Sequence, residues 1–310
     1  MADETTSRHI PILAQPIVDA LIEPFARLSP DEGTHWLVDC TLGGGGHSSL
    51  LLEALGKLPG QHKLLAVDQD PQAVDRGRER FAQAIREGKM EVLHSRFGEL
   101  VPALEGRKVL GMMADLGFSS DQIEDSERGL SFMHDGPLDM RLDPTRGESC
   151  REMLARIQES DLADILFQYA EERYSRRIAH AILERRREGR LPTTSRELAE
   201  VISHAVPAFA RHGRIHAATR SFQALRIAVN DELEELDSLL DRVILSLEPR
   251  GRVAILSFHS LEDRKVKQTF KPKEAVFRQT TKKPIEADDE ELKRNPRSRS
   301  AKLRIAERIP

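Results

Sequence analysis

The stretch Val38-Asp39-Cys40-Thr41-Leu42-Gly43-Gly44-Gly45-Gly46-His47 decides the fold of this chain. An apolar segment leads into Asp39, and after the four glycines the chain continues Ser48-Ser49-Leu50-Leu51-Leu52. This order predicts a buried strand, a tight turn and the start of a helix. Glycines let the backbone approach a ligand closely, and a helix N-terminus offers unpaired N–H groups. We therefore expect a nucleotide-like cofactor at this turn, with a flexible surface turn as the alternative.

The spacing around the glycines separates the classes of nucleotide. A dinucleotide fingerprint requires G-x-G-x-x-G/A, but Ser48 or Ser49 occupies the third position in either register. No Gly-Lys-Ser/Thr follows the glycines, which excludes a P-loop. Asp68 ends a short apolar strand 22 residues after Gly46, where an acidic residue would bind ribose hydroxyls, although it could equally be a turn residue at a strand end. What remains is a nucleoside cofactor without a pyrophosphate, and S-adenosylmethionine fits that description.

Strands alternate with helices in the first part of the chain. Apolar strands are predicted near residues 36–38, 63–67, 90–94 and 111–114, and helices near 71–87 and 99–104. This alternation argues for a parallel sheet in an α/β domain.

Helices replace this alternation between about residues 125 and 221. Apolar spacing predicts one long helix or two over 161–187, and Thr194-Ser195-Arg196-Glu197 is a capping box that opens another. A helix over 230–247, ended by Pro249-Arg250-Gly251, and a buried strand over 253–256 then resume the α/β pattern.

We therefore predict a Rossmann-like domain formed by residues 1–124 and 222–310 and interrupted by a helical insertion at 125–221. Such an insertion leaves from the carboxyl end of a strand, the edge where ligands bind in open α/β sheets. It would overhang the cofactor and grip a macromolecular substrate.

The composition is typical of a globular chain long enough for two domains, with 310 residues, 39% hydrophobic and 32% charged. No apolar run approaches the ~20 residues that span a bilayer, and residues 1–6 resemble neither a signal peptide nor a transit sequence. Cys40 and Cys150 are the only cysteines, so no metal spacing can be formed with them. We expect a cytoplasmic protein that binds no membrane and no metal.

The net charge of −4 hides a basic C-terminal segment. Residues 264–310 contain 15 Lys and Arg against 7 Asp and Glu. A segregated basic segment favours phosphate contacts and a nucleic-acid partner, whereas the interleaved charges of residues 173–190 are typical of a solvated helix face. Residues 295–304 mix small polar and basic residues, as in a segment that binds phosphate, with a solvated tail as the alternative.

Asp115-Leu116-Gly117-Phe118-Ser119-Ser120 follows the fourth predicted strand and is the candidate for chemistry. An exocyclic base amine is a poor nucleophile because its lone pair is delocalised into the ring. A carboxylate that accepts a hydrogen bond from the amine can localise that lone pair, and Asp115 could serve this purpose or contact the cofactor. A strand-end Asp that caps the next turn is the alternative. Residues 128–141 favour an ordered active-site loop over a linker, and His259 alone is more typical of a structural histidine.

Taken together, these blocks closely resemble the bacterial family called RsmH or MraW, which methylates the N4 amine of a cytosine in the ribosomal RNA of the small subunit. The resemblance runs through nearly the whole chain, and the matching segments are residues 39–48, 115–120, 127–143, 218–220, 222–226, 257–264 and 295–304.

The resemblance implies a Rossmann-like methyltransferase domain with a helical substrate domain, S-adenosylmethionine as methyl donor, no metal, and 16S ribosomal RNA of the small subunit as substrate. Phe97 would then pack near the adenine and Asp68 would bind the ribose hydroxyls. Asp115 as the group that polarises the cytosine amine is a hypothesis. Carried over by position, the cofactor contacts are Gly45, Gly46, His47, Asp68, Phe97, Asp115 and Gln122.

Two positions depart from the family pattern. Gln15 stands where the family commonly has a glutamate, which weakens any role of the N-terminal segment in the site. Ala217 stands where the family has proline in His-Pro-Ala-Thr-Arg, so the local backbone bend is in doubt.

Two other functions remain open. One is an RNA-binding assembly factor that has lost catalysis, against which the glycines, Asp68 and Asp115 argue. The other is a nicotinamide-dependent oxidoreductase, disfavoured by Ser48 and Ser49. A homodimer also stays open. With only two Tyr and one Trp in the chain, Phe or Arg would supply much of any stacking on bases.

Overall fold

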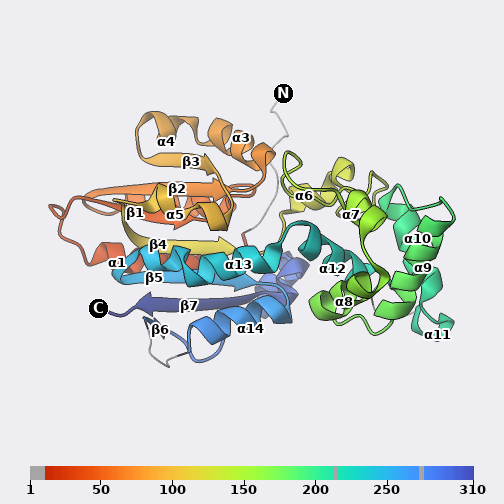
Figure 1. The fold of residues 1–310 in the computed structure, drawn as a ribbon. Coiled ribbons are helices and arrows are strands. Elements are labelled where there is room, and N and C mark those ends of the chain that lie inside the picture. The colour runs from red at the N-terminus through yellow and green to blue at the C-terminus, as the bar shows by residue number, and fades with distance from the viewer. Residues whose placement is uncertain (1–10, 212–214, 272–275) are drawn as a thin grey trace. The chain divides into compact units, whose positions relative to one another are not determined.

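The computed structural model describes residues 11–211, 215–271 and 276–310, and it divides into two compact units (Figure 1). The first unit contains the chain up to Gly117 and from Glu234 onward, and the second contains residues 118–233. The helical insertion predicted at 125–221 lies within the second unit.

A seven-stranded sheet forms the centre of the first unit, in the order β3-β2-β1-β4-β5-β7-β6. The five strands from β3 to β5 are parallel, and β7 is antiparallel to both β5 and β6. The strand order reverses between β1 and β4, and in open α/β sheets ligands bind at the carboxyl ends of the strands at such a point. The strands are β1 Thr34–Asp39, β2 Gln61–Asp68, β3 Met90–His94, β4 Lys108–Asp115, β5 Leu247–Ser257, β6 Phe277–Gln279 and β7 Lys302–Arg308.

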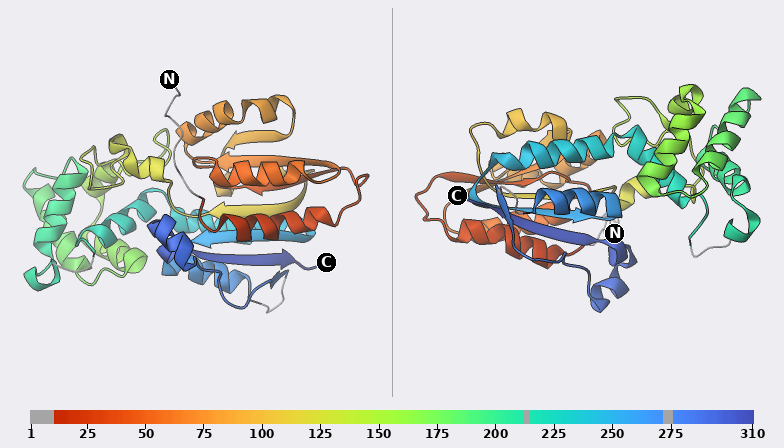
Figure 2. Two further views of the ribbon diagram at one scale, coloured as in Figure 1. Left: turned by 180° about the vertical axis from the view of Figure 1, so that it is seen from behind. Right: turned by 60° about the horizontal axis from the view of Figure 1, so that its bottom comes forward.

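Helices cover both faces of this sheet, as the front and back views show (Figures 1 and 2). On β1, Trp36 and Val38 belong to the core under α13 and α14, whereas Leu37 belongs to the core under α1 and α2. This alternation explains why the central strands β1, β2 and β4 contain continuous apolar runs, since both of their faces are buried. The helices and 3-10 turns of this part are α1 Ala14–Ala26, α2 Gly46–Gly56, α3 Pro71–Arg80, α4 Ala82–Arg86, η1 Phe97–Glu99, α5 Val101–Leu104, α13 Glu232–Asp241, η3 Val243–Ser246, α14 Ser260–Thr269, α15 Asp289–Arg294 and η4 Pro296–Ser300.

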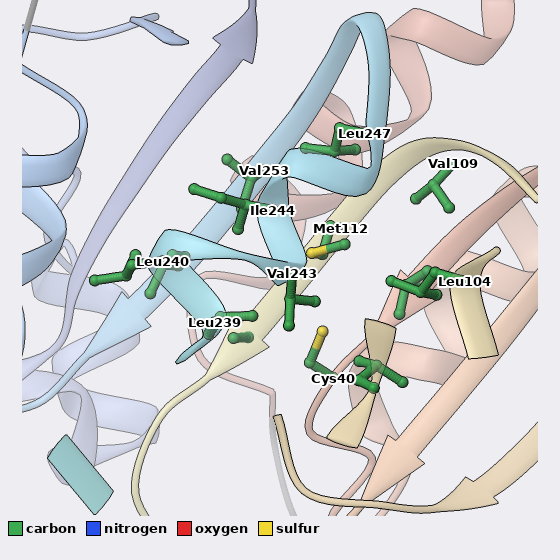
Figure 3. Packing of buried hydrophobic residues seen from close by; sticks show 14 of the residues in the cluster. Cys40, Leu104, Val109, Met112, Leu239, Leu240, Val243, Ile244, Leu247 and Val253 are labelled. Atoms are coloured by element: carbon green, nitrogen blue, oxygen red, sulfur yellow. The ribbon is translucent and has the colours of Figure 1, made fainter. Parts of the chain in front are cut away.

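The core beneath α13 brings together residues from distant parts of the sequence (Figure 3). Met112 on β4 and Val253 on β5 pack with Leu239 of α13 and Val243 of η3, and none of the four is more than 1% exposed. Burying a side chain of this size contributes about 1.5–3 kcal/mol. This packing holds the C-terminal strands against the N-terminal half of the sheet.

The four strands predicted in the first part of the chain are confirmed, but two predicted helices are wrong in extent. The helix predicted at 71–87 breaks at Phe81 into α3 and α4. The helix predicted at 230–247 ends at Asp241, and β5 already begins at Leu247 with Pro249 inside it. The apolar residues near position 244 are buried by a 3-10 turn instead of a continuing helix, which apolar spacing alone does not distinguish.

Part of the basic C-terminal segment is built into the sheet and paired with acidic residues. Strand β7 lies between β5 and β6, and Arg304 donates to Asp263 Oδ1 at 2.7 Å from Nε. Glu307 accepts hydrogen bonds from Arg252 (3.1 Å) and Arg278 (2.9 Å). Internal ion pairs therefore neutralise several charges that the sequence analysis had counted toward nucleic-acid binding.

The second unit is helical in the residues described for it, apart from one isolated bridge between Pro137 and Thr194. The two helices over 161–187 and the capping box at Thr194 agree with the sequence analysis. A single core is formed by α7 to α10 and α12. The helices and the 3-10 turn are α6 Ser120–Glu124, η2 Ser126–Arg128, α7 Cys150–Arg156, α8 Glu159–Ala170, α9 Ser175–Arg187, α10 Ser195–Ala205, α11 Ala208–Arg211 and α12 Thr219–Val229.

Candidate active site

Three aspartates end the three neighbouring parallel strands β2, β1 and β4. Asp39 pairs in register with Ala66 on β2 and with Met113 on β4, so Asp68 and Asp115 each lie two residues further along their strands. The carboxyl ends of parallel strands meet at one edge of the sheet. The sequence analysis is therefore right that Asp68 and Asp115 share an edge with the glycine turn.

The glycine turn is built around Asp39, whose side chain is fully buried. Its Oδ1 accepts from the Thr41 N–H at 3.1 Å and its Oδ2 from Ser48 Oγ at 2.6 Å. Burial raises the pKa of Asp39, and the hydrogen bond from Ser48 opposes this shift. Asp39 thus ties the end of β1 to the first turn of α2.

Gly45 takes the position that no larger residue could occupy without movement. Its φ is 75°, in the left-handed region, and a Cβ there would lie 2.8 Å from the Phe81 ring. Gly45 is also the N-cap of α2, with no side-chain cap. The backbone of Gly45 and Gly46 therefore runs at the sheet edge without side chains, as the predicted cofactor contact requires.

The Asp68 carboxylate is fixed by backbone donors at the end of β2. Oδ2 accepts from the Gly43 N–H at 2.7 Å, and Oδ1 accepts from the Asp70 N–H at 2.9 Å. Burial raises its pKa to about 6, while both backbone hydrogen bonds oppose the shift. Each carboxylate oxygen has two lone pairs, so Asp68 can still accept hydrogen bonds from a ligand.

His47 reaches Asp115 from the first turn of α2. Its Nε2 lies 3.0 Å from the Ile12 carbonyl, which can only accept, so the hydrogen on this ring nitrogen points to Ile12. Its Nδ1 lies 3.7 Å from Asp115 Oδ2. The imidazole therefore lies beside the Asp115 carboxylate, beyond hydrogen-bond distance.

Asp115 itself combines a fixed backbone with a partly exposed side chain. Its N–H donates to Thr41 Oγ1 at 2.7 Å, and its carboxylate is 19% exposed. Burial raises the pKa of Asp115 to about 6. His47 lowers it, and the charges of Asp39 and Glu262 raise it. A carboxylate with this pKa can be ionised at neutral pH and still take up a proton.

The charges at this edge decide between kinds of ligand. The charge of Asp39 raises the pKa of both Asp68 and Asp115. A pyrophosphate would be repelled by these carboxylates, whereas a ligand with a positive charge would be attracted. These carboxylates therefore fit S-adenosylmethionine better than a dinucleotide. S-adenosylmethionine combines ribose hydroxyls, which can donate to them, with a sulfonium cation.

The two other predicted cofactor contacts, Phe97 and Gln122, belong to other elements. Phe97 opens η1, three residues after β3 ends, and its half-buried side chain packs against the sheet core. Gln122 belongs to the second unit, where it forms a capping box with Ser119: its Oε1 accepts from the Ser119 N–H at 2.9 Å.

Two residues at the edge were missed in the sequence analysis as site residues, Asp39 and Glu262. Asp39 was quoted there only as the end of a strand. Glu262 accepts from the Phe258 N–H at 2.8 Å and closes a capping box whose N-cap is His259. Because histidine is not a common N-cap residue, the usual search for Ser, Thr, Asp or Asn does not find this box. His259 is thus a helix cap, in agreement with the structural role expected for it.

Burial raises the pKa of the Cys40 and Cys150 thiols, which makes both poor nucleophiles. In residues 11–211, 215–271 and 276–310, no group of three His, Cys, Asp or Glu side chains could hold a metal ion. None of the helices within those same ranges is long and apolar enough to cross a membrane.

Comparisons with known proteins show the family of this chain. A model of the MraW methylase family matches residues 6–309. Over 308 residues the chain is 47% identical to ribosomal RNA small subunit methyltransferase H of Synechococcus sp. strain RCC307, covering 97% of this chain and 95% of the relative. The protein of that name from Acinetobacter baylyi is 43% identical, covering 97% of this chain and 99% of the relative. Among solved structures, an rRNA methylase from Streptococcus thermophilus is 13% identical, covers 94% of each chain and has a TM-score of 0.41.

Proposed function

Because this chain belongs to the MraW methylase family, we propose that it transfers a methyl group from S-adenosylmethionine to the N4 amine of a cytidine in 16S ribosomal RNA. The observation that carries this proposal is the placement of Asp68 and Asp115 beside the glycine turn at one sheet edge. Relatives named ribosomal RNA small subunit methyltransferase H match this chain along nearly their whole length.

The cofactor would be held by residues from β1, β2 and β4. The Asp68 carboxylate would accept hydrogen bonds from the ribose hydroxyls, and the bare backbone of Gly45 and Gly46 would allow close approach. His47 would border the site from α2, and Phe97 would pack near the adenine. Gln122 belongs to this set on the strength of the family resemblance alone.

Asp115 would act on the amine. When bound, S-adenosylmethionine supplies an electrophilic methyl group. Asp115 would accept a hydrogen bond from N4–H, which keeps the nitrogen lone pair available, and would take up the proton that the amine loses. The pKa of about 6 is suited to both duties, since a general base works best with a pKa near the working pH. His47, with Nδ1 3.7 Å from Asp115 Oδ2, would border the carboxylate during this step.

The RNA must present its cytosine outside a base stack, because an amine within a helix cannot reach a carboxylate at a sheet edge. We assign the recognition of the RNA to the helical unit, residues 118–233, and place the reaction on the small ribosomal subunit in the cytoplasm. A homodimer is compatible with this function and is not required by it.

The experiment that tests this function uses labelled S-adenosylmethionine and small ribosomal subunits that lack base methylation, followed by nucleoside analysis. We expect the label in N4-methylcytidine. Label in another nucleoside would overturn the substrate, and no label despite measured cofactor binding would favour an assembly factor.

A further inference from the structure

Three aromatic rings form a ladder from the core of the helical unit to its surface. Phe222 on α12 is 5% exposed and belongs to the core. The Phe132 ring packs edge-on against it, with the centroids 5.0 Å apart at 74°. The His216 ring lies on Phe132 with the centroids 4.6 Å apart at 33°, and His216 is exposed. The outermost ring of the ladder is therefore an imidazole that rests on a half-buried ring, which in turn contacts the core.

The His216 ring is held in one orientation. Its Nδ1 accepts from the Ala218 N–H at 3.2 Å, and its carbonyl accepts from the Thr219 N–H at 3.0 Å, at the start of α12. With Nδ1 as acceptor, the ring hydrogen of the neutral imidazole is on Nε2. A ring that is already fixed costs little further entropy when a flat ligand packs on it.

The loop that carries Phe132 is equally well anchored. Ser195 Oγ donates to the His134 carbonyl at 3.2 Å, and the Ser195 N–H donates to the Gly136 carbonyl at 3.0 Å. Gly136 admits no side chain, because a Cβ there would lie 1.7 Å from the Ser126 carbonyl oxygen. The loop that supports His216 is thus tied to the start of α10 and packed closely against Ser126.

The surroundings of the ladder identify the kind of ligand. Met133 and Ile215, the sequence neighbours of the two outer rings, are 74% and 53% exposed. From Val201 to Asn230 the sequence contains four arginines and no acidic residue, although Arg226 is buried and paired with Glu232. Asp135 is one of the acidic residues on the adjoining loop, and it accepts from the Arg196 N–H at 3.3 Å. Apolar rims beside a flat ring in a basic stretch of chain suit a base with its phosphates better than an apolar protein surface.

We propose that the outer face of the His216 imidazole, backed by Phe132, is a platform on which an unpaired base of the RNA substrate stacks. The proposal rests on the RNA substrate of the proposed function and adds a base-binding site in the helical unit. It also explains how a chain with only two Tyr and one Trp can stack on bases, since a histidine and a phenylalanine supply the stacking surface. Any base can stack in this way, so the platform binds single-stranded RNA without sequence specificity.

The test uses the full chain and a short single-stranded RNA that contains one 2-aminopurine, whose fluorescence is quenched by stacking. His216→Asn keeps an acceptor for the Ala218 N–H and removes the ring, so it separates stacking from loop anchoring. We expect it to weaken RNA binding roughly 5- to 150-fold and to abolish the quenching. His216→Trp should retain both affinity and quenching. The matched control is His180→Ala, another exposed histidine of the same unit, which should change neither.

Wild-type quenching that persists in His216→Asn would overturn the platform, and so would a wild-type protein that binds the RNA without quenching or does not bind it. Cofactor binding and circular dichroism establish that the variants are folded. Nucleoside analysis of the wild-type reaction is a separate readout. If it yields N4-methylcytidine while the quenching is independent of His216, the proposed function stands and the platform is wrong. If it yields no N4-methylcytidine while the quenching depends on His216, the platform stands and the proposed function is wrong.

Discussion

Replacing Asp115 by asparagine should stabilise the protein without its ligand, by an amount that depends on pH. The carboxylate is held at a pKa of about 6 by burial, against about 3.9 in an unfolded chain. Above pH 6 the carboxylate is ionised in both states, and only the folded protein bears the cost of burying the charge. With about 1.36 kcal/mol for each unit of pKa, this cost is about 3 kcal/mol at pH 8. The folded protein takes up its proton first as the pH falls, so the cost shrinks to about 1 kcal/mol at pH 4.5.

Asparagine has nearly the same shape and no charge, so Asp115→Asn should recover most of this free energy. Urea unfolding at pH 8 and pH 4.5, followed by the fluorescence of Trp36, measures it in the right unit, because Trp36 is the single tryptophan and lies on β1. Asp75→Asn, at an exposed site on α3, is the control and should change stability by less than about 0.5 kcal/mol at either pH. A gain for Asp115→Asn that is absent, or equal at both pH values, would refute the assignment of the raised pKa to burial.

Three further predictions concern the turn, the loop and the cofactor. Gly45→Ala should lower the free energy of unfolding by about 1–2 kcal/mol, because of the positive φ and the contact with Phe81. It should also weaken the binding of S-adenosylmethionine in calorimetry. The control Gly56→Ala, which has open space around it, should change neither. Gly136→Ala should destabilise the helical unit by about 1–3 kcal/mol in thermal unfolding and lower RNA methylation while leaving cofactor affinity unchanged. Affinity for the cationic cofactor should fall as the pH drops below about 6, where Asp68 and Asp115 become protonated, and a pH-independent affinity between 5 and 8 would contradict the proposed charge attraction.

The parallel half of the sheet could be predicted from the sequence because its physics is local. A strand buried on both faces is a short apolar run, and β1, β2 and β4 each contain such a run that ends at an aspartate. The glycine turn and Asp68 followed from the same reasoning, since their spacing reflects the length of one strand–helix–strand unit.

The C-terminal third could not be predicted in this way. Strand β7 alternates charged and apolar residues, and Arg304 finds its partner Asp263 only after α14 and β7 are placed side by side. Counting charges along the sequence does not reveal such ion pairs, so the count overstated the basic surface of this segment. Likewise, the apolar residues at the end of α13 are as consistent with a helix as with the 3-10 turn that they form.

The site shows the same limit at single residues. The roles of Asp39 and Glu262 depend on backbone N–H groups that come near them only in the folded chain. The ring ladder that ends at His216 joins residues 132, 216 and 222, which share no periodic pattern in the sequence. Contacts of this kind arise from tertiary packing and leave no signal in spacing.

The most direct test of the account is the single-turnover rate of N4-methylcytidine formation by wild type and Asp115→Asn, with saturating S-adenosylmethionine and unmethylated small ribosomal subunits. If Asp115 accepts the proton of the cytosine amine, the variant should bind the cofactor and the RNA but react roughly 100- to 10,000-fold more slowly. An Asp115→Asn protein that forms N4-methylcytidine at the wild-type rate would contradict the account, because the carboxylate at the end of β4 would then have no part in the reaction.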